Sequence, residues 1–383
     1  MKITHNIRWK RLQIDVLRMP MYLKNVWKRL LNPAYLDDKA FEKCYDSIWR
    51  YAAEELSAEL IKLPDGFCDI KLNSRMTRMK HHLVMIDHPV TVELTRNKPL
   101  VHTLLRDAGL PVPDFAVFLY DDINSAKSFL DKAKRPCVIK PAEGSAGGFG
   151  VTTNIRTGRD LRQAVIYASL FSKNLLIEEH IPGESYRLLY LNGEFIDAVR
   201  RRAPRVVGDG KSTIAQLIEA ENTRRATMMG IDTLTRLTID QDCILTLRNN
   251  GTSLNDVPEA GVEVQIKTAT NQNSSKENES VRNLLVDALI QEGQRAASVL
   301  GVQLAGIDII TKDPTVSLAQ SGGVINEVNS VPGLHFHYQT CNPEHRVPVA
   351  VPILRHLLGV NNTSAHLLNE DLEHYHHETS HKY

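Results

Sequence analysis

The sequence has few cysteines, no long apolar run and almost no net charge, and each of these absences excludes a class of protein. Its five cysteines among 383 residues are scattered and form no C-x-x-C pair, so we expect neither a disulfide framework nor a zinc site. No apolar stretch approaches the roughly 20 residues that a membrane-spanning helix needs, and no secretory leader is recognised. The 46 basic and 45 acidic side chains nearly cancel, which argues against nucleic acid as a partner. We therefore expect a folded cytoplasmic protein, whose 42% hydrophobic content suffices for a sizeable core.

Two common nucleotide-binding motifs are also missing. The glycine-rich stretch at residues 143–152 lacks the G-x-G-x-x-G spacing of dinucleotide-binding folds. In Gly208-Asp209-Gly210-Lys211-Ser212, the position five before Gly210 is Arg205, where a P-loop needs glycine. Neither a Rossmann site nor a Walker A site is supported.

Residues 1–95 are predicted to form an N-terminal helical and substrate-side region. The pattern from Val16 to Leu60 is mainly helical, because apolar residues recur there at three- and four-residue spacing. Its start is locally basic, with Lys24, Lys28 and Arg29 beside apolar residues, so contact with a membrane surface or a partner is one alternative. A solvated helix face over the protein's own core is the favoured interpretation.

Residues 96–360 are predicted to form one α+β (α/β) domain, because helical and strand patterns alternate along it. A lid subdomain is expected at about 112–183, and Asn192-Gly193 predicts a type I′ hairpin. The polar stretch 268–280 is expected to be a mobile loop. The His-rich tail 361–383 is expected to be disordered rather than a metal site.

A strand that ends in lysine precedes the glycine-rich stretch. Cys137-Val138-Ile139-Lys140 is β-prone, and residues 143–152 follow it directly. An ammonium delivered beside bare backbone N–H groups is a plausible phosphate cradle. A glycine-rich hairpin tip with a solvent-facing lysine would give the same pattern.

Acidic and amide side chains occur in two later strand patterns. Asp308 lies in the apolar run 306–310, and Glu327 and Asn329 share one face of the strand predicted at 324–329. Three oxygen ligands on adjacent strands suit Mg²⁺, which prefers carboxylates, waters and substrate phosphates. The alternative is that Asp308 is an ordinary edge or turn residue.

The order of these motifs resembles the ATP-grasp superfamily. The motifs are Asn97-Lys98, Val138-Ile139-Lys140-Pro141, the glycine-rich loop, Ile177-Glu178-Glu179-His180-Ile181-Pro182-Gly183, Gly306-Ile307-Asp308 and Asn326-Glu327-Val328-Asn329. Further segments, Tyr186-Arg187-Leu188-Leu189-Tyr190 and Pro332-Gly333-Leu334, are similar to the ATP-grasp part of cyanophycin synthetases and fused glutathione synthetases. The resemblance covers about residues 63–358. It implies an N-terminal region, a small lid subdomain and a C-terminal subdomain that holds the metals.

The resemblance also implies roles for individual residues. Lys98 and Lys140 would contact the phosphates of ATP, Arg187 and Arg201 would steady the transferred phosphate or the acyl phosphate, and Lys140 would share in catalysis. The remaining nucleotide contacts would be Gly144, Ser145, Gly147, Gly148 and Gly150 in the closing loop, Glu178, Glu179 and Ile181 at the adenine, and Glu184 near the ribose. Asp308, Glu327 and Asn329 would hold Mg²⁺, commonly two ions, with Mn²⁺ as a substitute.

The function implied by the resemblance is that of an ATP-dependent carbon–nitrogen ligase. It would activate a carboxylate as an acyl phosphate and join it to the amine of an amino acid or small peptide. A small-molecule phosphotransferase and a non-catalytic ATP-binding protein are the alternatives. The family's Asn-Leu-Ser-Thr-Gly-Gly stretch is replaced here by residues 271–276, and no Mur-ligase-like part is present, so polymer synthesis is not expected. His335 and His337 would either line the acceptor site or serve the structure, and a homo-oligomer is expected.

Overall fold

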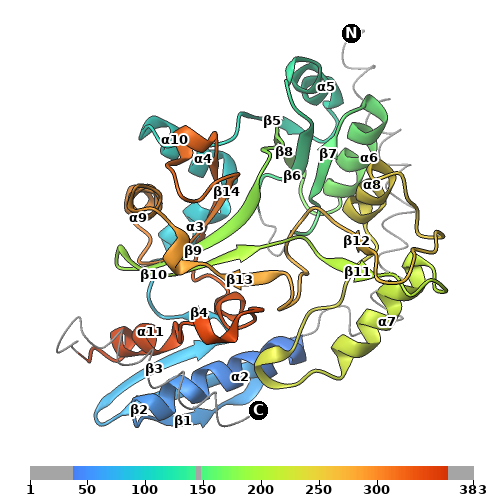
Figure 1. The fold of residues 1–383 in the computed structure, drawn as a ribbon. Coiled ribbons are helices and arrows are strands. Elements are labelled where there is room, and N and C mark those ends of the chain that lie inside the picture. The colour runs from blue at the N-terminus through green and yellow to red at the C-terminus, as the bar shows by residue number, and fades with distance from the viewer. Residues whose placement is uncertain (1–37, 144–147, 361–383) are drawn as a thin grey trace.

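The computed structural model describes residues 38–143 and 148–360, which build four sheets with their covering helices (Figure 1). The basic N-terminal stretch, the loop residues 144–147 and the His-rich tail lie outside the described residues, and so do the predictions made for them. None of the helices in the described ranges has the length and hydrophobicity needed to cross a bilayer.

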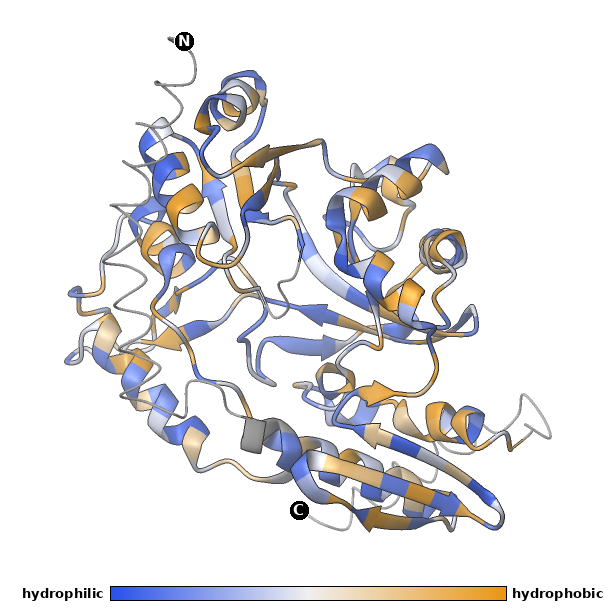
Figure 2. Ribbon diagram, turned by 180° about the vertical axis from the view of Figure 1, so that it is seen from behind, coloured by the Kyte–Doolittle hydropathy of each residue, from blue (hydrophilic) through white to orange (hydrophobic). Residues whose placement is uncertain are grey.

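The N-terminal unit is a helix packed on a small antiparallel sheet. The elements are α2 (Asp38–Glu55), β1 (Glu59–Lys62), β2 (Phe67–Leu72), β3 (Arg75–Lys80) and β4 (Leu83–Val84), in sheet order β1-β2-β3-β4. Hydrophobic and hydrophilic residues mix along these strands, as Figure 2 shows. Trp49 is buried and its indole N–H donates to the carbonyl of His81 at 2.7 Å. The late helix α11 (Ala350–Leu357) joins the same core, so the two ends of the described chain pack together.

This sheet corrects the prediction that the helical pattern continues to Leu60. The strands are only two to six residues long. Two of their turns place Asn73 and His81 at positive φ, in a conformation usually associated with glycine. Short strands joined by such turns give little periodicity in the sequence.

The second unit is a four-stranded antiparallel sheet that lies within the predicted lid. Its order is β5-β8-β6-β7, from strands β5 (Phe115–Leu119), β6 (Cys137–Pro141), β7 (Thr152–Ile155) and β8 (Asn174–Glu179). Helices α5 (Ile123–Lys132) and α6 (Gly158–Ala168) share its core. The β-prone run Cys137 to Lys140 is confirmed as strand β6.

The central sheet has five strands in the order β13-β10-β9-β14-β15. The strands are β9 (Glu184–Leu191), β10 (Glu194–Arg201), β13 (Asn278–Ser280), β14 (Leu304–Thr311) and β15 (Val324–Ser330). The helices beside it are α3 (Pro89–Arg96), α4 (Lys98–Asp107), α9 (Asp287–Leu300) and α10 (Leu318–Ser321). Asn192 and Gly193 both have positive φ between β9 and β10, as the predicted type I′ turn requires.

The two faces of this sheet have different neighbours. One face carries Leu188, Tyr190 and Ile307, which pack in a core with α4 and α9. The other face carries Leu189 and Leu304, which pack at one end against the N-terminal unit. The far end of that second face is polar, and it supplies the candidate site.

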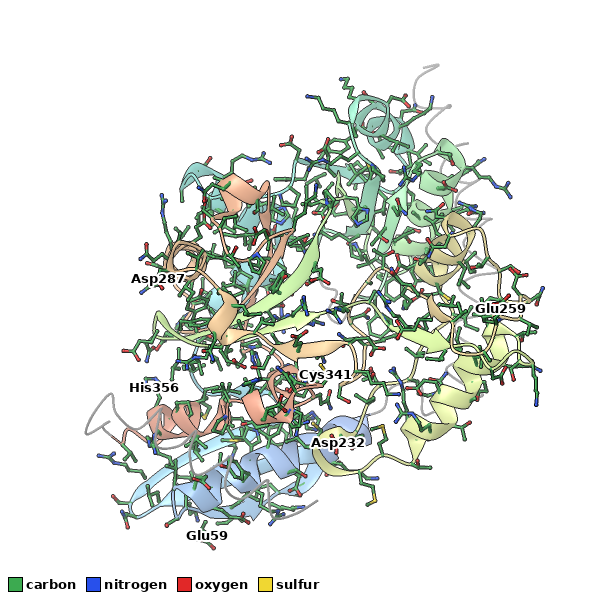
Figure 3. The ribbon with its side chains drawn as sticks, viewed as in Figure 1. Glu59, Asp232, Glu259, Asp287, Cys341 and His356 are labelled. Carbon is green, nitrogen blue, oxygen red and sulfur yellow. The ribbon has the colours of Figure 1, made fainter. Side chains whose placement is uncertain are left out.

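The fourth unit was not predicted. It consists of β11 (Arg205–Val207), β12 (Glu263–Gln265), α7 (Ile214–Ala226) and α8 (Gln241–Asn249), and it has a small core of its own. In Figure 3 the label Glu259 lies at the outer edge of this unit. The label Asp232, beside α2, lies at the short 3-10 helix η3 (Gly230–Asp232). The other 3-10 helices are η2 (Pro64–Gly66), η4 (Arg282–Leu284), η5 (Leu334–His337) and η6 (Pro343–His345).

The polar stretch 268–280 was predicted to be a mobile loop, and residues 268–277 do lie in the loop between β12 and β13. Its last residues form β13, which pairs with β10, and Gln272 and Asn273 are buried. Gln272 accepts hydrogen bonds from the backbone of Thr238 at 2.9 Å and from the buried ammonium of Lys267 at 3.1 Å. Asn273 donates to the carbonyl of Arg202 at 3.0 Å. Polar side chains can be buried when each finds a hydrogen-bond partner, and composition alone does not reveal those partners.

Candidate active site

A cleft of about 1350 Å³ lies where the lid sheet, the polar end of the central sheet and the fourth unit meet. Strands β6, β8, β9, β10, β14 and β15 all contribute lining residues. The cleft therefore collects residues that are more than 200 positions apart in the sequence.

A buried ion pair lies on the lid side of the cleft. Lys140 and Glu178 stand on the neighbouring strands β6 and β8, and their ammonium and carboxylate groups are 2.8 Å apart. The two residues are 5% and 3% exposed. The second carboxylate oxygen of Glu178 has no hydrogen-bond partner among the described residues. The pair is thus set in the wall of the cleft with part of its hydrogen-bonding capacity unused.

A second lysine faces the central sheet. Lys98 is the first residue of α4, and its ammonium is 3.4 Å from the carboxylate of Glu327 on β15. Burial alone would raise the pKa of Glu327, but Lys98, Lys140 and Arg187 together hold that pKa below its usual value. Glu327 is therefore ionised at neutral pH.

Asp308 lies at the centre of the polar face. It is directly opposite Arg187 on β9 and Glu327 on β15, and directly opposed residues in antiparallel strands share a face. The guanidinium of Arg187 binds both carboxylate oxygens of Asp308, one of them at 2.7 Å. Asn329 is two residues beyond Glu327, so it lies on the same face, as predicted.

Arg201 is the second arginine of this cluster. It is 5% exposed, and its ion-pair partner among the described residues is Asp308, at 3.8 Å. Its guanidinium carbon is 3.9 Å from the centre of the Phe336 ring. Burial lowers the pKa of Arg201 to about 10 against the opposing effect of Asp308, so the group stays charged at neutral pH.

Not every predicted nucleotide residue lines the cleft. Gly148, Ile181 and Glu184 line it, whereas Gly150 packs on Pro141 and Phe171. The carboxylate of Glu179 accepts a hydrogen bond from the backbone N–H of Lys134 at 3.2 Å, away from the cleft lining. Successive strand residues point to opposite faces, so Glu178 and Glu179 cannot both face the cleft. Gly144, Ser145 and Gly147 lie outside the described residues.

The two histidines after Pro332-Gly333 have different environments. His335 lines the cleft, and its ring is hydrogen-bonded to the hydroxyl of Tyr45 at 3.1 Å. His337 is fully buried and hydrogen-bonded to Asp197 at 2.7 Å. Of the two, His335 alone is among the lining residues of the described cleft.

Several lining residues were not predicted as site residues. They include His82 from the N-terminal unit, Phe336 from η5, His180 after β8, and Arg202, Arg205 and Arg236 near the fourth unit. Their positions depend on how separate units pack against the central sheet. Local sequence patterns carry no signal for that packing.

The residues at the centre of the cleft do not form a metal site made of protein ligands alone, but they suit a magnesium ion that is also bound by waters and substrate phosphates. Within the described ranges, no group of three His, Cys, Asp or Glu side chains could hold a metal by itself. Asp308 and Glu327 are instead two carboxylates on one sheet face, with the amide of Asn329 beside them. Mg²⁺ is usually bound through one or two carboxylates together with waters and substrate phosphates, so this donor set fits it.

Comparisons with known proteins agree with this arrangement. Residues 104–200 match the family model described as the D-ala D-ala ligase C-terminus. The chain is 31% identical over 278 residues to a cyanophycin synthetase from Geminocystis herdmanii, covering 71% of this chain and 31% of that protein. It is 28% identical over 290 residues to the glutathione biosynthesis bifunctional protein GshAB of Streptococcus mutans, covering 73% of this chain and 38% of that protein. The chain thus spans about a third of the length of these curated relatives.

The fold is similar to that of a solved relative. A bifunctional glutathione synthetase from Pasteurella multocida superposes with a TM-score of 0.52 at 19% identity, covering 83% of this chain and 44% of that one. At this identity the similarity concerns the fold alone. It confirms the mixed α/β class predicted from the sequence.

Proposed function

We propose that this chain, a member of the ATP-grasp superfamily, is an ATP-dependent ligase that forms an amide bond between a carboxylate and an amine. One observation carries this proposal. Two lysines, two arginines and a pair of carboxylates converge on one cleft from six separate elements: Lys98, Lys140, Arg187, Arg201, Asp308 and Glu327. When a carboxylate attacks the γ-phosphate of ATP, two anions meet, and cationic side chains are needed to offset the negative charge.

The nucleotide is proposed to lie between the lid sheet and the central sheet, within an ATP-grasp domain of residues 96–360. Lys98 and Lys140 would contact its phosphates, since both lysines line the cleft, where their ammonium groups lie 3.4 Å from Glu327 and 2.8 Å from Glu178 respectively. Glu178 and Ile181 would lie at the adenine edge, and Glu184 near the ribose. Glu179 is left out of this proposal because its carboxylate is turned to Lys134.

Asp308, Glu327 and Asn329 would hold Mg²⁺, with two ions proposed and Mn²⁺ as a substitute. The bound ion would neutralise negative charge on the phosphates of ATP. The chain's own residues provide the rest of the electrostatic stabilisation. Arg187 and Arg201 would offset the charge on the transferred phosphoryl group and on the acyl phosphate.

The proposed reaction uses no nucleophile from the protein. An oxygen of the substrate carboxylate attacks the γ-phosphorus of ATP, and ADP leaves. The amine then attacks the carbonyl carbon of the acyl phosphate, the C–O bond breaks, and inorganic phosphate leaves with one former carboxylate oxygen. The buried walls around Lys140 and Arg201 limit access of water to this intermediate.

The substrates are proposed to be an amino acid or a small peptide. The relatives include a cyanophycin synthetase and a glutathione biosynthesis protein, and both names point to amino-acid-derived products. A cytoplasmic location is part of the same proposal, because all five cysteines are free thiols, as a reducing compartment would keep them.

The proposal is tested with purified protein, ATP, Mg²⁺ and pools of amino acids and dipeptides. We expect phosphate release that depends on a pool, together with a new mass equal to acid plus amine minus water. Asp308→Asn should abolish both signals, while Asp313→Asn, an exposed acid in the loop after β14, should leave them unchanged. A phosphorylated product without condensation would instead identify a phosphotransferase.

A further inference from the structure

The short helix η5 (Leu334–His337) touches two separate parts of the molecule, helix α2 and strand β10. The backbone N–H of Leu334 donates to the hydroxyl of Tyr45 on α2 at 2.8 Å. The ring of Phe336 lies against Arg201, and the ring of His337 is hydrogen-bonded to Asp197. This one turn therefore links the N-terminal unit to strand β10 beside the cleft.

Arg201 has little else to orient it. One terminal nitrogen donates to the carbonyl of Thr270 at 3.2 Å, and Nε has no hydrogen-bond partner within the part of the chain that is described. Asp308 is 3.8 Å away and is already bound by both donor groups of Arg187. Beside these polar contacts, the ring of Phe336 supports the Arg201 guanidinium, whose carbon is 3.9 Å from the ring centre. A guanidinium stacked on a ring keeps its N–H donors in one plane, available to an anion in the cleft.

The Asp197–His337 pair fixes the other end of this contact. Asp197 and Arg201 are four residues apart on β10, so they share a face of the strand. Both Asp197 and His337 are 0% exposed. Burial raises the pKa of Asp197, and the hydrogen bond from His337 opposes that rise. Neither the second oxygen of Asp197 nor the second ring nitrogen of His337 has a partner among the described residues.

A buried polar pair with unused hydrogen-bonding capacity is a poor source of stability, because an apolar pair of the same volume would serve as well or better. Such a pair does fix geometry, since a single alignment satisfies its one hydrogen bond. Here that alignment holds η5 across β10, with Phe336 under Arg201.

We propose that Phe336 is a positioning residue for Arg201, and that the buried Asp197–His337 pair acts through Phe336 by fixing η5 on β10. The proposal rests on the proposed function, in which Arg201 binds the phosphoryl group of the acyl phosphate. It adds the residues that set the direction of that guanidinium.

The test uses acetylphosphonate, an acyl phosphate analogue that cannot transfer its phosphoryl group. Its affinity is measured by calorimetry on the full chain in saturating Mg²⁺ and ADP. The affinity for ADP is measured separately. We expect Phe336→Leu to weaken acetylphosphonate about tenfold, the scale of a desolvated cation–π contact, while the affinity for ADP stays unchanged. Phe336→Tyr keeps the ring face and should restore the affinity.

Phe195→Leu is the matched control, because Phe195 is also on β10 but packs in the core on the opposite face of the sheet. Asp197→Asn should weaken acetylphosphonate in the wild-type background and have no further effect in the Phe336→Leu background. If Asp197→Asn does not fold, His337→Gln takes its place, and the Phe336 variants stand by themselves.

The outcomes separate this inference from the proposed function. Equal acetylphosphonate affinity in wild type and in a folded Phe336→Leu variant would overturn the role of Phe336. Additive losses in the double variant would overturn the coupling of Asp197 to Phe336. A wild-type protein that binds ADP but not acetylphosphonate would contradict the acyl phosphate site itself, and with it the proposed function.

Discussion

Replacing Lys140 by methionine removes one partner of a buried ion pair and, in the proposed function, one contact to the phosphates of ATP. The two effects have different sizes and can be measured separately. The ammonium of Lys140 lies 2.8 Å from Glu178, and both residues are more than nine-tenths buried. Removing one partner of such a pair leaves the other charge buried alone, which costs about 3 to 5 kcal/mol of the free energy of unfolding.

The second effect concerns affinity for the nucleotide. A hydrogen bond to a charged group contributes about 1.5 to 3 kcal/mol, so Lys140→Met should weaken ATP binding by about ten- to a hundredfold. The double variant Lys140→Met/Glu178→Gln removes both charges. Its stability should return to within about 1 kcal/mol of wild type, while its affinity for ATP stays low.

The assay is urea denaturation for stability and calorimetry for Mg²⁺–ATP affinity, both on the four members of the cycle. Lys127→Met is the matched control, because Lys127 and Asp131 form an exposed pair at 3.8 Å, worth less than about 1 kcal/mol. If the double variant regained wild-type affinity, the loss in the single variant would come from the lone Glu178 carboxylate, and Lys140 would not contact the phosphates.

Two further predictions concern the packing around the site. Gly306→Ala would place a Cβ 2.5 Å from Pro332 and 3.1 Å from the side chain of Arg187. We therefore expect the free energy of unfolding, measured by urea denaturation, to fall by about 1 to 3 kcal/mol, and acetylphosphonate to bind more weakly. An unchanged affinity for acetylphosphonate would contradict this prediction. His102 is 1% exposed, and burial, followed by the charge of Lys140, lowers its pKa to about 4. The unfolded chain therefore binds a proton below pH 6.5 that the folded chain does not, and stability should fall by about 3 kcal/mol between pH 6.5 and pH 4 from this group alone. The His102→Gln variant should lose less stability between pH 6.5 and pH 4 than the wild type does. An identical dependence of stability on pH in both proteins would show that His102 does not cause this loss.

Much of the central cleft could be predicted because it depends on strand periodicity. Glu327 and Asn329 share a face through the two-residue repeat of β15, and Asp308 lies opposite Glu327 because β14 and β15 are neighbours. The turn at Asn192-Gly193 was predictable for a similar reason, since few dipeptides adopt two successive positive φ values.

The features that were missed depend on contacts between distant segments. The carboxylate of Glu179 accepts a hydrogen bond from the backbone of Lys134 because of the register of β8, and the expected role of Glu179 at the nucleotide stays a prediction. The stretch 268–280 was expected to be a mobile loop because it is polar, but the buried side chains of Gln272 and Asn273 within it are hydrogen-bonded to Thr238 and Arg202. Phe336 becomes a neighbour of Arg201 only when η5 packs on β10. No local pattern encodes these partners.

The most direct test of the central claim follows an oxygen atom. The acid substrate found in the pool assay is labelled with ¹⁸O in its carboxylate and incubated with ATP, Mg²⁺ and the amine, and the released phosphate is examined by mass spectrometry. Activation through an acyl phosphate predicts one ¹⁸O atom in each inorganic phosphate released, with ADP unlabelled. Unlabelled phosphate together with amide product, or ¹⁸O found in AMP, would contradict the account.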